Sequence, residues 1–406
     1  MERYALVHDV ARSELQTASV SFEEPPLATD DEMRLVHDDA YLRVLFSGAL
    51  SRESLSRVGL GAWSDEWATR TRLITGATLA AMRRSLTSCR SLDAVSSSWH
   101  GPGGVACVAA GGTHHAFPAH GEGYCFVNDL AVAARVALTD PALGVRRVAV
   151  LDVDVHQGNG TAACLAAEPR AVTVSVHGAR NYPWSTRFAS SYDIDVPDDA
   201  TDAVYLTGVR DALALLEGLS RAAAADPGGL LRLHRANGLA ARRAGWGEKV
   251  LPGLPSEDEV RRDPLIAAVV AAEPDAAMDV ARAAARSWAA GCPLSSAVLP
   301  QPDSLPPPAF NSLASIDLLL VQAGVDCLEG DRLGRLRVSR AGLQERNRLI
   351  FEWADDRGVP VCVTMGGGYG RDLRASALAH VDVFREAAAS HARRCKAYPL
   401  FAEASS

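Results

Sequence analysis

The sequence lacks the features that mark membrane-spanning and secreted proteins. No apolar run reaches the ~18 residues that a membrane-spanning helix needs, because Arg, Asp or Glu interrupts every stretch of Ala, Val and Leu. The first residues contain no basic segment that leads into a continuous apolar core, as a secretory signal would. We therefore expect an intracellular protein, cytoplasmic, nuclear or both, that does not cross a membrane.

Positive charge and paired cysteines are also scarce. Lys and Arg number 41 against 49 Asp and Glu, so the net charge of -8 provides no basic field for binding nucleic acid directly. The eight cysteines form no CxxC pair, which fits neither a cysteine-rich zinc site nor a disulfide framework. We interpret most of them as buried thiols in a reducing compartment.

The sequence does contain an alternation of strand-like and helix-like segments. Short apolar runs that are typical of buried strands lie at 105–110, 148–155, 171–176, 316–322 and 359–365. Segments with helical periodicity lie between them, at 128–138, 203–219 and after Ser339, an expected N-cap. This alternation predicts an α/β fold, with a central parallel sheet, helices on both faces and an active site at the carboxyl ends of the strands.

One long segment departs from this pattern. Residues 220–312 are rich in Ala, Arg, Pro and Gly, and the segment is too long for an ordinary connection of about 2–6 residues. We interpret it as a low-complexity insertion in a single catalytic domain that spans 1–406, and we assign it no chemistry.

Two aspartates and a histidine lie in the motif LDVDVHQGNG, at 151–160. Side chains two residues apart on a strand point to the same face, so Asp152, Asp154 and His156 are expected side by side. Burying two carboxylates among Ala and Val costs several kcal/mol unless a cation or another partner compensates. Asp154 and His156, with a third ligand from elsewhere and a position for water, would form the pattern of a catalytic zinc site.

A candidate third ligand follows a second strand-like run. Asp326 comes just after IDLLLVQAG, so we expect it at the same edge of the sheet. Taken alone, a helix-capping role is the commoner one for such an aspartate. The placement of two carboxylate-bearing strand ends in one parallel sheet makes shared metal binding the better interpretation.

Adjacent histidines lie in the glycine-rich segment 110–129. His114 and His115 can each titrate near neutral pH, which suits a general base and a general acid that act on opposite sides of one bond. A metal site and a chance pair are the alternatives. The glycines let the backbone approach a ligand closely, which favours an active-site loop. We expect Asp152 to orient His114, and Asn159 to orient His115.

A tyrosine follows three glycines in MGGGYG, at 365–370. The motif contains neither GxGxxG nor a following GK[ST], so it does not predict a phosphate-binding loop. Tyr369, expected at the same end of the sheet, could donate a hydrogen bond to a developing oxyanion. A half-packed surface tyrosine is the alternative.

Together these motifs resemble the histone deacetylase superfamily of zinc-dependent amidohydrolases. The motifs that carry the resemblance occur in the family's order: GGTHHAFPAHGEGYCFVND, VLDVDVHQGNG, VSVHG, QAGVDCLEGDRLG and MGGGYG. The resemblance extends over about 1–219 and 316–389 and implies the arginase/deacetylase-like form of the α/β fold. The Asn in HQGNG and the segment EGDRLGRL are most similar to the class IV deacetylases and their bacterial and plant relatives.

The resemblance implies a role for each candidate residue. The ligands of one zinc ion would be Asp154, His156 and Asp326. The catalytic residues would be His114, His115, Tyr369, Asp152 and Asn159. A potassium ion beside the zinc would be bound by Asp152, the backbone of Asp154 and His156, and Ser175. The acyl-lysine tunnel would be lined by Gly123, Tyr124, Tyr182, Gly367 and Gly368.

The neutral side chain of Asn159 bears on the charge of its expected partner. An amide stabilises an imidazolium less than a carboxylate does, so His115 is predicted to be neutral at rest.

The activity that the resemblance implies is zinc-dependent hydrolysis of the amide of acyl-lysine, acetyl or longer, in histones or other proteins, with a role in chromatin regulation. A polyamine deacetylase and a non-catalytic acyl-lysine-binding protein are the alternatives. An arginase-like binuclear manganese enzyme is disfavoured, because the positions of its additional carboxylates hold Gly158 and Gly324. The acyl chain length, the physiological substrate and the oligomeric state stay open.

Two departures from the family pattern accompany the resemblance. The family's first strand and a loop ending in a sequence like HRFPM are expected to be missing before Met1, which would remove one wall of the active site. The second departure is the 220–312 insertion. We hypothesise that both come from a faulty gene model with a retained intron and a missed first exon. Transcript reads that begin at Met1 and span the insertion would contradict this hypothesis.

Overall fold

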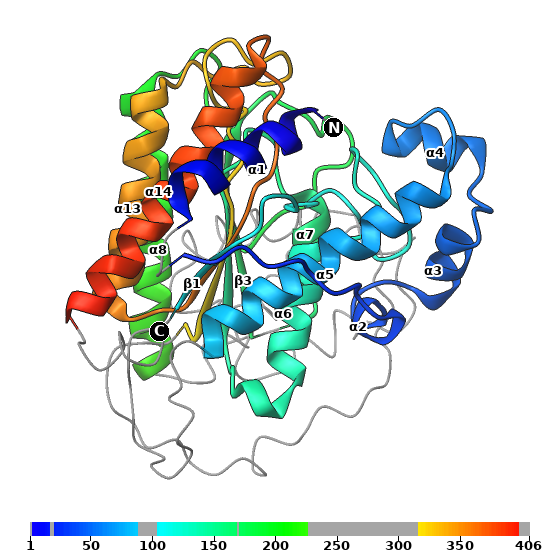
Figure 1. Ribbon diagram of the computed structural model, residues 1–406, viewed down its shortest axis with the longest axis horizontal. Coiled ribbons are helices and arrows are strands. Elements are labelled where there is room, and N and C mark those ends of the chain that lie inside the picture. The colour runs from blue at the N-terminus through cyan, green and yellow to red at the C-terminus, as the bar shows by residue number, and fades with distance from the viewer. Residues whose placement is uncertain (1, 17–19, 88–103, 169, 226–315, 398–406) are drawn as a thin grey trace, which may run out of the picture.

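The computed structural model describes residues 2–16, 20–87, 104–168, 170–225 and 316–397 (Figure 1). A six-stranded parallel sheet lies at its centre, with the strand order β1-β6-β5-β2-β3-β4. The strands are β1 (Val105–Cys107), β2 (Val148–Asp152), β3 (Ala171–Gly178), β4 (Tyr192–Val196), β5 (Leu318–Gln322) and β6 (Val361–Thr364). This architecture confirms the predicted α/β fold.

Helices cover both faces of the sheet (Figure 1). One face packs against α1 (Glu2–Leu15), α8 (Asp202–Ala225), α13 (Arg340–Arg357) and α14 (Leu373–Ala397). The other face packs against α5 (Asp65–Thr87), α6 (Asp129–Thr139) and α7 (Asn159–Leu165). The shorter helices on that side are α2 (Asp30–Arg34), α3 (Asp39–Phe46), α4 (Arg52–Val58) and the 3-10 helix η1 (Pro141–Leu143).

The central strands are buried on both faces, which explains why they occur in the sequence as continuous apolar runs. On β2, Ala149 and Leu151 belong to the core beneath α8 and α13, whereas Val148 and Val150 belong to the core beneath α6. The side chains of β5 divide between the two cores in the same way. The sheet therefore separates two apolar cores, and the polar residues of the central strands β2 and β5, Asp152 and Gln322, lie where those strands end.

The register of the sheet brings strand ends together at one edge. Asp152, the last residue of β2, pairs with Ser175 of β3 and with Gln322, the last residue of β5. The loops that follow β2 and β5 consequently start side by side, although they are far apart in the sequence. This juxtaposition positions the candidate site.

The predicted strands are all present, but β2 ends earlier than expected. The apolar pattern predicted a strand over 148–155, whereas β2 ends at Asp152. The chain turns there, and the Val155 N–H donates to the Asp326 carboxylate at 2.9 Å rather than to a neighbouring strand. The prediction that the two metal ligands of this motif lie along one face of the strand is therefore wrong, because both lie in the turn that follows it.

Other elements show which local patterns are informative. The Ser339 N-cap of α13 is confirmed, since its hydroxyl accepts a hydrogen bond from the Gly342 N–H at 3.0 Å. β4 was not predicted. It is a partly exposed edge strand with the sequence YDIDV, whose alternation of apolar and acidic residues was the available signal. The helices α1 to α5 were not predicted either.

The expected insertion at 220–312 lies outside the described residues from 226 onward. Helix α8 continues to Ala225 instead of ending at 219 as predicted. Within the part of the chain that the structure describes, no helix combines the length and the apolarity that crossing a membrane requires.

Candidate metal centre and active site

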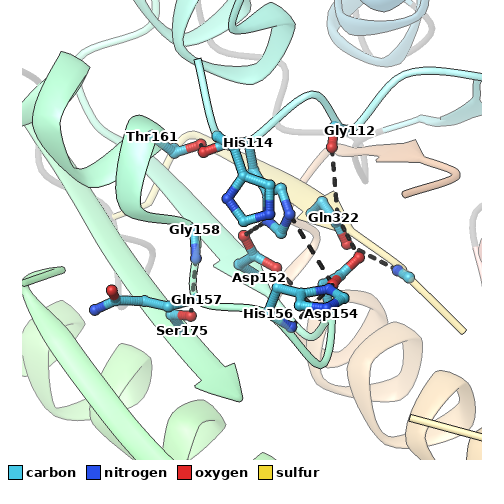
Figure 2. Close-up of polar contacts among 12 residues, drawn as sticks. Gly112, His114, Asp152, Asp154, His156, Gln157, Gly158, Thr161, Ser175 and Gln322 are labelled. Carbon is cyan, nitrogen blue, oxygen red and sulfur yellow. Dashed lines mark hydrogen bonds and ion pairs between the residues drawn. The ribbon is translucent and has the colours of Figure 1, made fainter. Parts of the chain in front are cut away.

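Loops from four strands converge at the carboxyl edge of the sheet. They follow β1, β2, β5 and β6, and each carries polar residues singled out in the sequence. Figure 2 shows His114, Asp152, Asp154, His156 and Gln322 pointing toward one another at this edge. The tertiary structure therefore assembles one polar, buried site from segments that are distant in the sequence.

The predicted metal ligands form one compact group. Asp154, His156 and Asp326 are buried, and each offers a ligand atom within 4.8 Å of the other two. His156 Nδ1 lies 2.9 Å from Asp154 Oδ1 and 3.2 Å from Asp326 Oδ2. The Oδ2 atom of Asp326 is buried and accepts no hydrogen bond from any described residue. Two buried carboxylates and a histidine nitrogen, with one carboxylate oxygen that only the His156 ring approaches, are the donor set that a divalent cation fits.

The remaining oxygens of the two carboxylates are held by neighbouring groups. Asp154 Oδ2 accepts hydrogen bonds from Gln322 Nε2 at 2.7 Å and from the Gly367 N–H at 2.9 Å. Burial would raise the pKa of Asp154, but the charges of His114 and His156 and the hydrogen bonds hold it well below its ordinary value. Burial and the neighbouring Asp154 charge raise the pKa of Asp326 to about 7. The protein alone therefore leaves the Asp326 charge poorly compensated.

The adjacent histidines have different partners. His114 Nδ1 lies 2.6 Å from the Asp152 carboxylate, and His115 Nδ1 lies 2.7 Å from Asn159 Oδ1, the two contacts that the sequence predicted. Burial would lower the pKa of His114, but the charges of Asp152 and Asp154 raise it to about 9. Burial, with the charges of His114 and His156, lowers the pKa of His115 well below its ordinary value. His115 is therefore neutral, as predicted, and its neighbour is charged at pH 7.

Tyr369 lies beside the metal ligands on the loop after β6. Its ring centroid is 6.5 Å from that of His156. The Tyr369 N–H donates to Asp331 Oδ2 at 2.6 Å, and its carbonyl accepts from Arg332 Nε at 2.9 Å, so the backbone is held from both sides. Burial and the charges of Asp326 and Asp154 raise the pKa of the Tyr369 hydroxyl well above its ordinary value. The hydroxyl therefore stays a hydrogen-bond donor at neutral pH.

The five predicted tunnel residues also surround the site. The Tyr182 ring meets that of His115 edge to face at 4.9 Å, and Tyr124, which is 59% exposed, lies 6.2 Å from the Tyr369 ring. At Gly123, a Cβ atom would come within 2.6 Å of the His115 ring. At Gly367 it would collide with Asp326, and at Gly368 it would come within 2.8 Å of His380. Only glycine leaves room for these close approaches.

The expected potassium ligands lie next to each other across β2 and β3. Asp152 Oδ1 accepts from the Asp154 N–H at 3.1 Å, and the Ser175 hydroxyl lies 2.9 Å from His177 Nδ1. The structure places these side chains together, and the ion itself stays a prediction.

Four further residues that support the site were not predicted. Gln322 carried a signal, because it is the polar end of the apolar run LLLVQ. Asp331 and Glu122 lie inside the family motifs QAGVDCLEGDRLG and GGTHHAFPAHGEGYCFVND, but nothing in those motifs marked either residue as part of the site. Arg3 had none, yet its guanidinium donates to the Gly368 carbonyl and lies 5.4 Å from the centroid of the Tyr369 ring. Contacts across such sequence distances leave no local pattern.

Comparisons with known proteins agree with this geometry. A family model described as the histone deacetylase domain matches residues 1–216 and 308–384, well over half of the chain. The chain belongs to the histone deacetylase family. Its buried Asp154, His156 and Asp326 group is typical of the zinc site of histone deacetylases and is consistent with a metal-dependent amidohydrolase.

Relatives of this histone deacetylase-family chain differ in how much of it they match. An uncharacterized protein of Picosynechococcus sp. is 26% identical over 387 residues, which are 95% of this chain and 91% of that protein. Histone deacetylase 8 of Arabidopsis thaliana is 33% identical over 147 residues, which are 36% of this chain and 35% of that protein.

Solved structures show the fold. The HD domain of HDA15 has a TM-score of 0.53 at 16% identity, with 99% of this chain and 91% of that chain covered. An acetylpolyamine aminohydrolase from Burkholderia pseudomallei has a TM-score of 0.55 at 18% identity, with 95% and 89% covered. At these identities the likeness extends to the fold of histone deacetylases and not to a substrate.

Proposed function

We propose that this protein is a zinc-dependent hydrolase of acyl-lysine, of the histone deacetylase type. The observation that carries the proposal is the buried Asp154, His156 and Asp326 group beside two histidines, each with its own hydrogen-bond partner. The proposed substrate is an acyl-lysine in a protein or peptide, histone or not. The Asn in HQGNG and the EGDRLGRL segment support a place near the class IV deacetylases.

The described residues fit a bound zinc ion. Asp154, His156 and Asp326 would hold it, and Asp326 Oδ2, which accepts no hydrogen bond from the described residues, would gain a cation. When bound, zinc supplies a Lewis acid that polarises the amide carbonyl and acidifies a water molecule. Asp152 and Ser175, with the backbone of Asp154 and His156, are the proposed potassium ligands.

The two histidines have different roles in the proposed reaction, and only His115 transfers a proton. His115 Nδ1 is bound to Asn159 Oδ1, so Nε2 is available to take a proton from the attacking water. The same nitrogen then returns the proton to the leaving lysine amine. His114 keeps its positive charge because the Asp152 carboxylate binds its Nδ1, and that charge stabilises the negative charge that develops on the substrate.

Tyr369 stabilises the oxyanion of the tetrahedral intermediate. Its backbone is held by Asp331 and Arg332, and its hydroxyl keeps its proton at neutral pH. Loss of one oxyanion donor typically lowers kcat by about 10²–10³-fold. Tyr182 and Tyr124 would line the channel that the acyl-lysine enters.

The deciding experiment measures deacylation of acetyl-, butyryl- and myristoyl-lysine peptides by the full 406-residue chain. We expect activity that a chelator abolishes and zinc restores, and that falls by about 10²–10³-fold in Tyr369→Phe without loss of bound zinc. N-acetylputrescine and N-acetylspermidine serve as parallel substrates.

Each contrary outcome supports a different alternative. Turnover of the acetylated polyamines without turnover of any peptide would replace the proposal with a polyamine deacetylase. Zinc binding and peptide binding without turnover of any substrate would replace it with a non-catalytic acyl-lysine-binding protein.

A further inference from the structure

A buried carboxylate lies behind the His115–Asn159 pair. Glu122, on the loop after β1, is 3% exposed. Its Oε1 accepts hydrogen bonds from Asn159 Nδ2 at 3.2 Å, from the Tyr182 hydroxyl at 2.6 Å and from the Thr186 hydroxyl. A carboxylate at this depth is costly unless it is hydrogen-bonded, and the donors to Glu122 all meet Oε1, whereas the buried Oε2 receives no hydrogen bond from the described residues.

Glu122 is an anion in the folded protein. Burial alone would raise the pKa of its carboxyl, but the His120 ring, 3.8 Å from Oε2, and hydrogen bonds from Thr186, Tyr182 and Asn159 hold the pKa below its ordinary value. The Glu122 carboxylate is therefore negatively charged at neutral pH.

The amide of Asn159 has acceptors on one side only. Its Nδ2 faces Glu122 Oε1 at 3.2 Å and the Thr186 carbonyl at 2.9 Å, and neither atom can donate a hydrogen bond. The Thr186 hydroxyl, 3.4 Å from Nδ2, donates its hydrogen to Glu122 and so also presents an acceptor to Nδ2. Exchanging the amide oxygen and nitrogen would place the oxygen against a carboxylate and a carbonyl. Asn159 Oδ1 is therefore directed at His115 Nδ1, 2.7 Å away.

This orientation determines the tautomer of His115. Because Asn159 Oδ1 only accepts, His115 Nδ1 must carry the hydrogen, and Nε2 keeps its lone pair. Without acceptors behind it, the Asn159 amide would offer His115 its NH2 group equally well, and would then stabilise the tautomer that cannot take a proton at Nε2. The Thr186 carbonyl belongs to the backbone and stays in every variant, so Glu122 Oε1 is the acceptor that a side-chain substitution can change.

We propose that Glu122 is a positioning residue that, through Asn159, fixes His115 in the tautomer whose Nε2 accepts a proton. The inference rests on the role proposed above for His115. His115 is hydrogen-bonded to the neutral amide of Asn159, and that amide is hydrogen-bonded in turn to the Glu122 carboxylate. His114, in contrast, contacts the Asp152 carboxylate directly. The two histidines are thus oriented by different hydrogen-bond partners, an amide for His115 and a carboxylate for His114.

The first test compares Glu122→Gln with Thr186→Val in the zinc-loaded protein. Glu122→Gln keeps the shape of the side chain but can donate to Asn159 as well as accept. We expect kcat on the acetyl-lysine peptide to fall by about 10-fold or more, as for other lost orienting partners, with KM changed less than about 2-fold. Thr186→Val removes one hydroxyl from Glu122 and the long 3.4 Å contact of that hydroxyl with Asn159 Nδ2, but it leaves the contacts of Nδ2 with Glu122 Oε1 and the Thr186 carbonyl. Its kcat should therefore stay within about 3-fold of the parent.

NMR spectroscopy distinguishes an effect of Glu122 on the His115 tautomer from an effect on the packing of the loop. In protein labelled with 15N-histidine, the parent should show His115 with a protonated Nδ1 and an unprotonated Nε2. Glu122→Gln should shift the His115 signals toward a mixture of tautomers, and Thr186→Val should not. A single unchanged tautomer together with parental kcat in Glu122→Gln would overturn the proposal.

A double-variant cycle provides the sharpest test. Asn159→Asp alone sets two carboxylates against each other at the 3.2 Å contact, so its activity should fall. In combination with Glu122→Gln, the new carboxylate gains an amide donor, and activity should recover at least about 5-fold over Asn159→Asp alone. Equal losses with no recovery would show that Glu122 only packs the loop.

These outcomes can be told apart from failure of the proposed function. If the parent hydrolyses no acyl-lysine peptide, the deacylase assignment fails, whereas the NMR comparison still reports whether Glu122 controls the His115 tautomer. If the parent is active and the tautomer is insensitive to Glu122, the positioning role alone fails.

Discussion

At the scale of single residues, the metal centre depends on carboxylates whose charges the protein itself does not fully compensate. Asp154 receives hydrogen bonds from Gln322 and Gly367, and Asp326 Oδ1 receives one from the Val155 N–H. Asp326 Oδ2 receives none from the described residues. The two carboxylates therefore favour a bound cation and oppose folding without one.

Asp326→Asn tests this opposition directly. The amide keeps an oxygen for the Val155 N–H but removes the charge of the ligand. Loss of a residue that only orients a ligand typically weakens metal binding by about 10–100-fold, and we expect a larger loss of zinc affinity here. The metal-free variant should be more stable than the metal-free parent at pH 8. Zinc affinity is measured by competition with a chromogenic chelator, and stability by urea unfolding.

The pH dependence of that stability gain has a definite sign. The pKa of Asp326 is about 7 when folded, above its ordinary value, so the folded state holds its proton longer than the unfolded chain. The parent therefore loses stability as pH rises from about 4 through 7, and the advantage of Asp326→Asn should shrink as pH falls from 8 to 5. An advantage that is constant with pH would contradict this account.

At the scale of elements, the loop after β5 holds the loop after β6. The Asp331 carboxylate accepts from the Tyr369 N–H at 2.6 Å and from the Leu333 and Gly334 N–H groups at 2.8 and 3.0 Å. The position of the Tyr369 side chain thus depends on Asp331, whose carboxylate hydrogen bonds in the described part of the chain go to backbone N–H groups and not to a metal ligand.

Asp331→Ala should lower kcat by about 10-fold or more while the protein keeps its zinc, because Tyr369 loses a backbone tether. Asp317→Ala is the matched control. Asp317 also binds two backbone N–H groups, those of Arg146 and Arg147, but it lies before β5, at the amino end of that strand. It should reduce stability and leave kcat unchanged. Equal kcat losses in both variants would indicate a general effect on folding.

His37 joins the segment between α2 and α3 to the loop that carries the adjacent histidines. Its Nδ1 lies 3.0 Å from the Phe117 carbonyl, and its Nε2 accepts from the Asn128 N–H at 2.9 Å. Burial lowers the pKa of His37 to about 4, so the folded protein excludes a proton that the unfolded chain binds below pH 6.5. This contribution to stability is present above pH 6.5 and is lost as pH falls toward 4.

We expect a loss of about 2–3 kcal/mol from this group between pH 7.5 and 4.5. Urea unfolding of the parent and of His37→Asn at both pH values measures it. The variant should be less stable than the parent at pH 7.5, with a smaller decrease at pH 4.5. A parallel pH dependence in the two proteins would exclude His37 as the source.

At the scale of the whole molecule, stability comes from two apolar cores separated by the sheet rather than from the metal centre. One core includes Leu151 and Val321 with residues of α8, α13 and α14, and the other includes Val150 and Leu320 with residues of α5 and α6. Figure 1 shows these helices on the two sides of the sheet. The metal centre lies only at its edge.

Chelation should therefore lower the melting temperature without unfolding the protein at 25 °C. A ligand at 100 times its Kd stabilises the folded state by about 2.7 kcal/mol, and this contribution disappears when zinc is removed. Calorimetry across a zinc titration measures the shift, and Asp326→Asn should show little of it. Unfolding by chelator at 25 °C would mean that the cores are insufficient by themselves.

Local patterns determined the chemistry of the site and much of the sheet. Continuous apolar runs predicted the buried strands, because strands covered on both faces contain few polar residues. The family motifs identified Asp154, His156, Asp326 and the two histidines, and the expected partners Asp152 and Asn159 lie where those histidines need them. Each of these motifs is contiguous in the chain, so the sequence alone carries it, although the side chains that meet in the site come from different motifs.

Only the tertiary structure decided which strand ends meet and which distant side chains complete the site. β2 pairs with β5 as far as Asp152 and Gln322, and the loops that follow these two residues bring Asp326 to the Val155 N–H. Glu122 reaches Asn159, and Arg3 reaches Gly368, through the packing of separate elements. Such contacts arise from sheet order and helix docking, which no local pattern encodes, so they leave no trace in the sequence of either segment.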